Sequence, residues 1–242
     1  MKEGTEIVAD PIFSKIGLAA DRLGVDSYVI GGYVRDAILG RDCKDIDVVC
    51  IGDGMALAQA FSKLFHPNPP VSLFKTFGTA QVKFDDIEIE FVGARKESYA
   101  RHSRKPEVSP GTIEDDQNRR DFTVNALAIE LNVAHFGHII DPFGGLEDLQ
   151  NKILRTPLAP AQTFDDDPLR MMRAIRFATQ LDFTITEETF KGIQQIADRI
   201  SIVSQERITD ELQKIMMTKT PSKGWYLLKE AGLLQHIFLL LL

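Results

Sequence analysis

The sequence predicts an α+β fold in which a mixed head of strands and helices is followed by an all-α region. Two observations lead to this prediction. Short β-branched and aromatic stretches alternate with helical patterns in the first half of the chain, whereas almost every window after residue 164 has helical spacing. We therefore expect a head over residues 1–155 and a helical region over 156–242. The helices expected after the head are 165–180, 186–199, 205–217 and 221–231.

The head elements follow from local patterns. Apolar residues at helical spacing predict a helix over 12–23, and Gly24 is expected to end it. A short apolar strand, a glycine turn, a second helix and a valine-rich strand to about Ile51 come next. Beyond them, the sequence predicts a helix at 54–65, strands at Val71–Phe74, Thr79–Phe84 and Ile87–Val92, and a hairpin turn at Asp85-Asp86.

Residues 94–118 show neither a helical nor a strand period, so we expect a long irregular loop there. Its basic residues include Arg95, Lys96, Arg101, Arg104 and Lys105. Two interpretations stay open: a solvated surface excursion, or a segment that contacts phosphate. A further helix is expected to begin at Arg119-Arg120.

Composition limits the class of protein. A chain of 242 residues can bury a substantial core, and its net charge of −7 argues against attraction of nucleic acid to the whole surface. Cys43 and Cys50 are the only cysteines, so a disulfide framework or a zinc site is not expected. The N-terminus has no apolar leader and no run reaches membrane-span length, so we expect a cytoplasmic protein without a membrane partner. The apolar end, Leu239–Leu242, is typical of a fragment.

The most informative feature is the pair Asp45 and Asp47, which flank Ile46 in a predicted strand. Side chains two residues apart on a strand point to the same face, so the two carboxylates lie side by side. They repel each other and lose hydration, and a divalent cation such as Mg²⁺ removes both penalties. The alternative is a solvated strand end.

Gly31 and Gly32 lie between the preceding apolar strand and a helix that contains Arg35. Amide groups at such a turn favour anions, so the segment predicts a phosphate site beside the carboxylate pair. Taken alone, two glycines indicate only a tight turn. Their order and short spacing relative to the two aspartates favour nucleotide chemistry.

Two further segments combine arginine with aspartate. Arg120 and Asp121 stand at the start of the helix expected from residue 119. They are either surface charges or groups that line a nucleotide site. In the second case Arg120 would contact phosphate and Asp121 would lie near the ribose. Asp167 precedes a row of three arginines spaced three apart, which share one helix face. Either the row is a solvated face balanced by aspartates, or it faces an anion, with Asp167 beside its first member reading a base edge. The row consists of Arg170, Arg173 and Arg176.

These segments together resemble the class II tRNA nucleotidyltransferase and bacterial poly(A) polymerase family. The matching stretches are GGYVRDAILGRDCKDID (31–47), RRDFTVNALA (119–128), DPFGGLEDLQNKILR (141–155) and DDDPLRMMRAIRFA (165–178). The resemblance implies a nucleotidyltransferase head of the polymerase-β type with a mixed sheet and a helical neck. It also implies an enzyme that uses Mg²⁺ to add C and A from CTP and ATP to the 3′ end of tRNA, releasing pyrophosphate by a two-metal mechanism.

The resemblance also implies roles for individual residues. Asp45 and Asp47 would be the metal ligands, and Glu90 matches a strand carboxylate of the family with a less defined catalytic part. The glycine turn and two arginines would hold the triphosphate: Gly31, Gly32, Arg35 and Arg120. Asp167 and Arg170 would pair with the incoming base, and Arg173 and Arg176 would contact phosphate or support that pair.

One departure and three alternatives accompany the resemblance. Asp166 stands where the family usually has glutamate, one methylene longer. Within the family, the alternative is a poly(A) polymerase or an enzyme that adds only A, although Phe77-Gly78-Thr79-Ala80 resembles the tRNA enzymes. A non-catalytic nucleotide-binding or RNA-binding regulator is the alternative from another class. The oligomeric state does not follow from the sequence.

Overall fold

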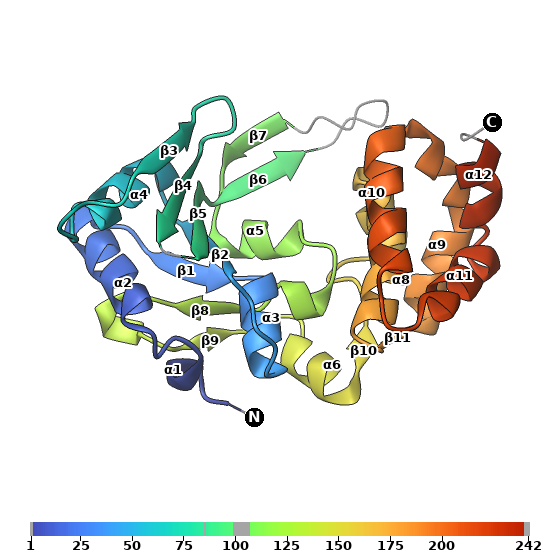
Figure 1. Cartoon of the computed structure of the whole chain (residues 1–242), viewed down its shortest axis with the longest axis horizontal. Coiled ribbons are helices and arrows are strands. Elements are labelled where there is room, and N and C mark those ends of the chain that lie inside the picture. Colours follow the sequence, from blue (N-terminus) through green and yellow to red (C-terminus); the bar gives the residue numbers. More distant parts are fainter. Residues whose placement is uncertain (1, 85, 99–106, 240–242) are drawn as a thin grey trace. The chain divides into compact units, whose positions relative to one another are not determined.

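The structure is a computed structural model, and it describes residues 2–84, 86–98 and 107–239 (Figure 1). Within these residues the contacts divide the chain into two compact units. We call residues 2–98, 107–119 and 124–146 the sheet unit, and residues 120–123 and 147–239 the helical unit. The boundary that we expected at residue 155 stays a prediction.

Seven strands of the described chain form a mixed sheet in the order β3-β4-β5-β2-β1-β8-β9, which confirms the predicted α+β head. The strands β2 and β5 run parallel, and the other neighbouring pairs in this sheet are antiparallel. Their bounds are Ser27–Ile30 (β1), Asp45–Cys50 (β2), Val71–Phe74 (β3), Thr79–Phe84 (β4), Ile87–Gly93 (β5), Ala128–Glu130 (β8) and Ile139–Ile140 (β9). The strands expected at 71–74 and 79–84 are therefore confirmed, and the strand from Ile87 ends one residue later than expected.

The helices α2 and α4 pack on one face of this sheet and on each other (Figure 1). Alternate residues of the central strands point toward them: Val48 of β2 faces Phe91 of β5, and the Phe91 ring lies 5.4 Å from the ring of Phe61 on α4. Gly24 ends α2 in the left-handed conformation, as expected. The helices of the sheet unit are α1 (Gly4–Ile7), α2 (Pro11–Leu23), α3 (Gly32–Ile38), α4 (Gly54–Ser62) and α5 (Ile113–Asn118).

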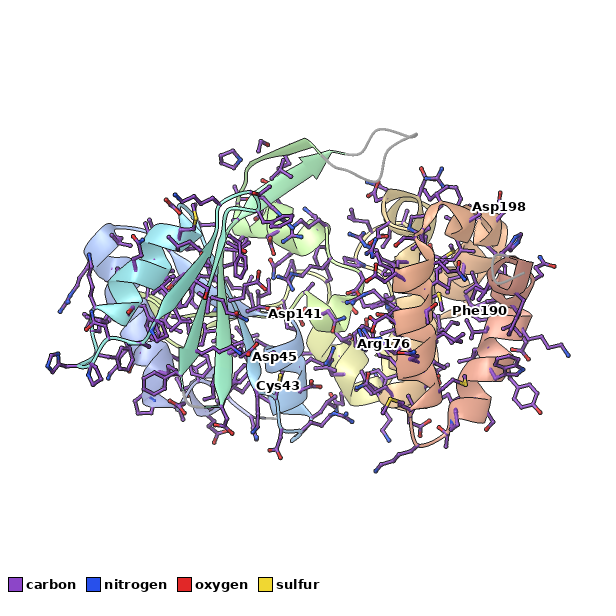
Figure 2. The ribbon with its side chains drawn as sticks, turned by 45° about the horizontal axis from the view of Figure 1, so that its top comes forward. Cys43, Asp45, Asp141, Arg176, Phe190 and Asp198 are labelled. Carbon is purple, nitrogen blue, oxygen red and sulfur yellow. The ribbon has the colours of Figure 1, made fainter. Side chains whose placement is uncertain are left out.

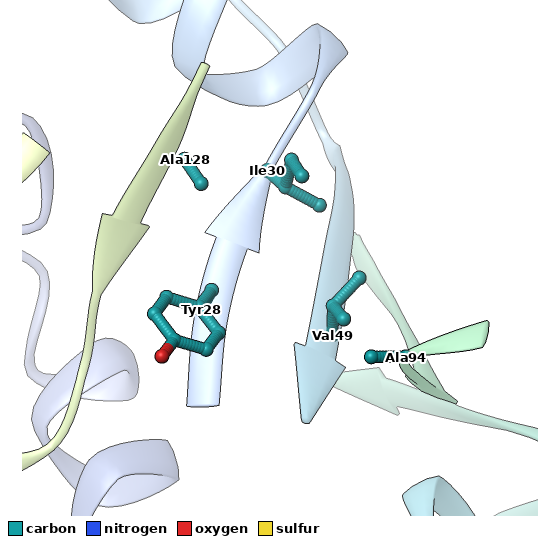
Figure 3. Close-up of a cluster of buried hydrophobic side chains, with 5 residues drawn as sticks. All are labelled: Tyr28, Ile30, Val49, Ala94 and Ala128. Carbon is teal, nitrogen blue, oxygen red and sulfur yellow. The ribbon is translucent and has the colours of Figure 1, made fainter. Parts of the chain in front are cut away.

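The opposite face of the sheet carries a smaller apolar cluster at one end of the strands. Figure 3 shows Tyr28 and Ile30 of β1 beside Val49 of β2, with Ala94 and Ala128 at its edges. Ile113 of α5 packs against this cluster. Because side chains alternate along β2, Val49 shares its face with Asp47 and Asp45, so the apolar end of this face continues directly into a polar end.

The prediction of a long irregular loop over 94–118 is wrong for the part of this segment that the structure describes. Arg95–Ser98 (β6) and Glu107–Pro110 (β7) pair as an antiparallel ribbon, and α5 follows. The expected residues Arg101, Arg104 and Lys105 lie outside the described residues. Strand pairing supplies regularity here that the sequence pattern lacks.

The helical unit confirms the predicted all-α region. Its helices are α7 (Pro160–Asp166), α8 (Leu169–Gln180), α9 (Glu187–Gln195), α10 (Gln205–Met216), α11 (Pro221–Glu230) and α12 (Leu233–Leu239), and it contains the 3-10 turn Ala197–Ile202 (η3). The 3-10 turn Val133–His135 (η2) belongs to the sheet unit, and Thr123–Asn125 (η1) begins in the helical unit and ends in the sheet unit. The helix α6 (Gly145–Asn151) joins the two units along the chain. A short parallel pair, β10 (Ile153–Leu154) and β11 (Thr184–Ile185), precedes α7 and α9 respectively.

Candidate active site

The two aspartates of the carboxylate pair lie at the start of β2. Asp45 is exposed, Asp47 is half-buried, and Ile46 between them is buried in the opposite face. The Asp45 side chain makes no hydrogen bond or ion pair with any residue that the structure describes. Cys43 lies just before it and donates its thiol hydrogen to the Asp45 carbonyl oxygen at 3.3 Å (Figure 2). The alternation predicted for a strand thus places both carboxylates on one face.

The parallel partner strand places two glutamates beside the aspartates. In the register of β2 and β5, Asp45 faces Glu88 and Asp47 faces Glu90. The Glu88 carboxylate accepts a hydrogen bond from Gln81 at 3.1 Å and pairs with Lys83, both on β4. Glu88 is therefore held by its neighbours on β4, whereas the exposed Asp45 side chain has no such contact with the described residues.

The surroundings of Glu90 disfavour the ionised form of its carboxyl group. Burial raises its pKa above the ordinary value, and the negative charge of Asp47 raises it further. A hydrogen bond from the Thr79 hydroxyl and the positive charge of Arg95 act in the opposite direction. Across residues 2–84, 86–98 and 107–239, no three His, Cys, Asp or Glu side chains are grouped so that they could hold a metal ion. A ligand role for Glu90 therefore rests on the resemblance alone.

The donor set of the aspartate pair fits a hard divalent cation. Carboxylate oxygens are the ligands that Mg²⁺ prefers, and two neighbouring negative charges on an open sheet face lose their repulsion when a cation lies between them. Asp45 and Asp47 are the residues that would hold it.

The turn at Gly31 and Gly32 follows the end of β1, next to the start of β2 where Asp45 and Asp47 lie. Ile30 faces Asp47 in the register of β1 and β2, so Gly31 follows one residue beyond that row. Gly31 has φ 83°, a conformation that favours glycine, and its amide donates to the Leu127 carbonyl at 3.0 Å. Gly32 opens α3. The predicted phosphate turn and the predicted metal ligands are thus neighbours in one unit.

Arg35 is buried, with 6% of its surface exposed, and lies close to the turn. A side chain on Gly32 would approach its guanidinium within 3.7 Å. The guanidinium donates to both carboxylate oxygens of Asp36, at 3.0 and 2.7 Å, and to Asn125 Oδ1 at 2.6 Å. Its role in binding the triphosphate stays a prediction, and the structure adds two residues that orient it.

The segment from Arg119 is not the helix that we expected. The chain bends at Arg120 and Asp121, and a 3-10 turn follows from Thr123. Asp121 is buried, and its carboxylate accepts the amide of Phe122 at 2.9 Å. Such a local bond between a side chain and the backbone competes with the helix. The Thr123 hydroxyl donates to the buried Asp148 carboxylate at 2.6 Å, which anchors the turn in the helical unit.

Asp121 forms an ion pair with Arg173, the second member of the arginine row. Its Oδ2 accepts Nε of Arg173 on α8 at 2.7 Å, and this ion pair is the main cause that raises the pKa of Arg173. Arg120 is half-buried. The ribose contact proposed for Asp121 and the phosphate contact proposed for Arg120 stay predictions.

The expected base-reading pair, Asp167 and Arg170, is fixed by the rest of the helical unit. The amide of Leu169 donates to Asp167 Oδ1 at 3.2 Å, and Arg207 of α10 donates to Oδ2, also at 3.2 Å. Arg170 is buried and donates to the Thr163 carbonyl at 3.2 Å. Both side chains are held at the start of α8.

Arg176, the third member of the arginine row, is paired inside the helical unit. Its Nε donates to the carboxylate of Glu211 on α10 at 2.7 Å, and the guanidinium lies 4.0 Å from the centre of the Phe177 ring. Burial is the largest influence on the Arg176 pKa and lowers it. Figure 2 shows Arg176 on α8. In the structure the anion that pairs with Arg176 is therefore the Glu211 carboxylate. The predicted contact of Arg176 with phosphate stays a prediction.

Four residues that support the site were not found from the sequence: Asp36, Asn125, Arg207 and Glu211. Arg207 and Glu211 are four residues apart on α10, so both lie on one helix face. That spacing was visible, but their partners are more than 30 residues away in the chain, and no local pattern identifies such partners.

The comparisons with known proteins decide the family. The family described as "Poly A polymerase head domain" matches residues 27–155, which is more than half of the chain. The chain belongs to this family. A second family, described as "Probable RNA and SrmB-binding site of polymerase A", matches residues 182–241. The first match contains the aspartate pair and the glycine turn, and the second contains α10 with Arg207.

Curated relatives carry names of tRNA nucleotidyltransferases. The chain is 41% identical over 169 residues to an A-adding tRNA nucleotidyltransferase from Aquifex aeolicus, covering 70% of this chain and 20% of the relative. It is 36% identical over 214 residues to a CC-adding tRNA nucleotidyltransferase from Halalkalibacterium halodurans, covering 88% of this chain and 50% of the relative. The chain thus spans about half, or less, of the relatives that it matches.

Solved structures agree with this fold. A CCA-adding enzyme in an apo form matches with a TM-score of 0.86 and 31% identity, over 97% of this chain and 57% of that one. A tRNA nucleotidyltransferase complexed with a primer tRNA and an incoming ATP analogue matches with a TM-score of 0.81 and 32% identity, over 92% and 62%. No helix in the described part of this chain combines the length and apolar character that membrane crossing requires.

Proposed function

We propose that this chain is the catalytic head and neck of a tRNA nucleotidyltransferase, which adds C and A to the 3′ end of tRNA from CTP and ATP. The observation that carries the proposal is the pair Asp45 and Asp47, which share one sheet face at the row where the Gly31–Gly32 turn begins, with Asp45 exposed and Asp47 half-buried. Membership of the head-domain family supports the same chemistry.

The reaction joins the RNA 3′ oxygen to the α-phosphorus of the nucleotide, breaks the bond from that phosphorus to the β-phosphate, and releases pyrophosphate. Mg²⁺ held by Asp45 and Asp47 would lower the pKa of the 3′ hydroxyl and offset charge on the triphosphate. The turn amides and Arg35 would bind the triphosphate, and Asp36 and Asn125 keep that guanidinium in place.

Base selection would belong to Asp167 and Arg170. A carboxylate acceptor beside a guanidinium donor can pair with the hydrogen-bonding edge of cytosine or adenine, and a base that leaves one of them unpaired loses about 1–3 kcal/mol. The contacts from Leu169 and Arg207 hold the acceptor, which favours a fixed reading geometry.

An enzyme that adds only A is the second candidate, because one relative at 41% identity carries the name A-adding tRNA nucleotidyltransferase. Labelled CTP and ATP offered with tRNA that lacks CCA, with tRNA that ends in CC, and with oligo(A) distinguish the candidates. Two C residues and one A on the first RNA support CCA addition. Extension of the CC-ended RNA alone supports A addition, and a long tail on oligo(A) supports a poly(A) polymerase.

The regulator alternative has its own test. Binding of CTP or ATP that is unaffected by Mg²⁺, without extension of any of the three RNAs, would favour a non-catalytic nucleotide-binding protein. Asp45→Ala is the matched variant: it should abolish extension while the protein stays folded. Full extension by this variant would contradict the assignment of the metal ligands.

A further inference from the structure

Phe77-Gly78-Thr79-Ala80 leads from the β3–β4 turn into β4, and the proposed reaction gives this segment no task. Gly78 has φ 66°, and the Phe77 amide donates to the Phe74 carbonyl at 2.9 Å, so the glycine serves the turn. Thr79 is the first residue of β4. The turn therefore delivers Thr79 into the sheet at a fixed position.

Thr79 is a buried polar residue beside an acidic one. It has 8% of its surface exposed, and its hydroxyl is one of the groups that lower the pKa of the Glu90 carboxylate, by hydrogen bonding. In the register of β4 and β5, Thr79 faces Val92 and Gln81 faces Glu90, so Thr79 and Glu90 are diagonal neighbours on one face. The contact therefore follows from strand register as well as from side-chain conformation.

The same face brings Glu90 next to the predicted metal ligands. Glu90 and Asp47 face each other across β5 and β2, and two negative carboxylates at this position repel. A donor on another side can hold a carboxylate that is repelled from one side. Thr79 lies on that other side, on β4, and the positive charge of Arg95 also attracts Glu90.

We propose that Thr79 is a positioning residue, whose hydroxyl fixes the Glu90 carboxylate on the side of Asp47 for nucleotide transfer. The proposal rests on the proposed function and deepens it, because it assigns a task to the segment from Phe77 to Ala80. In this role Thr79 needs no contact of its own with the RNA or the nucleotide. Its effect passes through Glu90.

Thr79→Val tests this directly, since valine keeps the shape and strand preference of threonine but has no hydroxyl. We expect kcat for tRNA extension to fall about 10- to 100-fold, as is typical when a residue that orients a catalytic group is lost. KM for CTP should stay within about twofold, because base and triphosphate contacts are unchanged. Thr79→Ser keeps the hydroxyl and should restore most of the rate. Thr76→Val, in the exposed turn, is the matched control and should behave like the wild type.

A double-mutant cycle separates positioning from a general structural role. With Glu90→Ala, Thr79→Val should have no further effect on kcat, because nothing is left to position. An equal loss in both backgrounds would overturn the proposal, and so would a Thr79→Val variant with the wild-type rate.

A crystal structure of Thr79→Val gives a result that needs no turnover. We expect the Glu90 carboxylate to turn away from Asp47, and finding it in its original orientation would overturn the proposal. Failure of the wild-type protein to extend any RNA would contradict the proposed function instead, and the orientation of Glu90 would still decide the part played by Thr79.

Discussion

The aspartate pair of the sheet unit and the arginine row of the helical unit differ in how their charges are compensated. Asp45 is exposed without a partner among the described residues, beside Asp47, which shares its sign of charge. In the helical unit, Arg173 pairs with Asp121 and Arg176 with Glu211. The difference teaches that Asp45 of the sheet unit is available to a ligand, whereas Arg173 and Arg176 of the helical unit stabilise the fold of their own unit.

The largest effect should come from removing the exposed Asp45 carboxylate. Asp45→Ala removes a ligand that nothing in the described protein replaces, so the rate of nucleotide addition should fall at least about 10³-fold. The melting temperature should not fall, because the variant loses a charge that repels Asp47. Single-turnover extension of tRNA and thermal unfolding measure the two quantities.

Asp86→Ala is the control for this comparison. Asp86 lies in the β4–β5 turn, is exposed and pairs with Lys44. Its loss should leave the rate within about twofold, since exposed ion pairs contribute about 0–1 kcal/mol. Equal losses of rate in both variants would mean that the face carrying Asp45 has no special part in the reaction.

The next effect concerns the stability of the helical unit. Glu211 is buried, with 3% exposed, and neutralises a largely buried Arg176. Glu211→Ala leaves that positive charge without its buried partner, so the free energy of unfolding should fall by about 3–5 kcal/mol. Urea unfolding followed by circular dichroism measures it.

Asp210→Ala changes the neighbouring residue of α10, which is exposed and pairs with Lys214. It should cost less than about 1 kcal/mol. Should the two variants unfold at the same urea concentration, the buried ion pair would not be what holds α8 to α10.

A smaller effect concerns selection of the base. Arg207→Ala frees one oxygen of Asp167, so the preference for CTP over UTP, measured as a ratio of kcat/KM, should fall about tenfold. Arg207→Lys keeps a donor and should recover part of the preference. Glu206→Ala changes an exposed charge next to it and should leave the ratio unchanged. An unchanged ratio in Arg207→Ala would indicate that Asp167 needs no support from α10.

The same contrast explains what the sequence could predict. Period-two alternation placed Asp45 and Asp47 on one face, and helical spacing predicted the helices of the second region, because both patterns are local. The ribbon of β6 and β7 was missed because β6 has no apolar residue and β7 has only Val108 and Pro110, so neither strand shows a clear apolar alternation and their regularity comes from pairing with each other. The turn at Asp121 was missed because an aspartate that bonds the next amide competes with the helix that the flanking residues favour. Arg207 and Glu211 act through partners distant in the chain, and such contacts have no local signature.

The smallest effect should be a pH dependence of stability that belongs to Glu90. Its pKa is raised in the folded protein by burial and by Asp47, so the ionised carboxylate opposes folding. Below the ordinary carboxyl pKa, Glu90 is protonated in both states, and Glu90→Gln should match the wild type. As the pH rises through the raised pKa, the wild type should lose stability relative to Glu90→Gln. Melting temperatures from pH 3.5 to 7 in a chelating buffer measure this. Glu88→Gln is the comparison, because the Glu88 carboxylate pairs with Lys83. A wild type that gains stability relative to Glu90→Gln as the pH rises would show that the sheet unit, like the helical unit, compensates its charges internally.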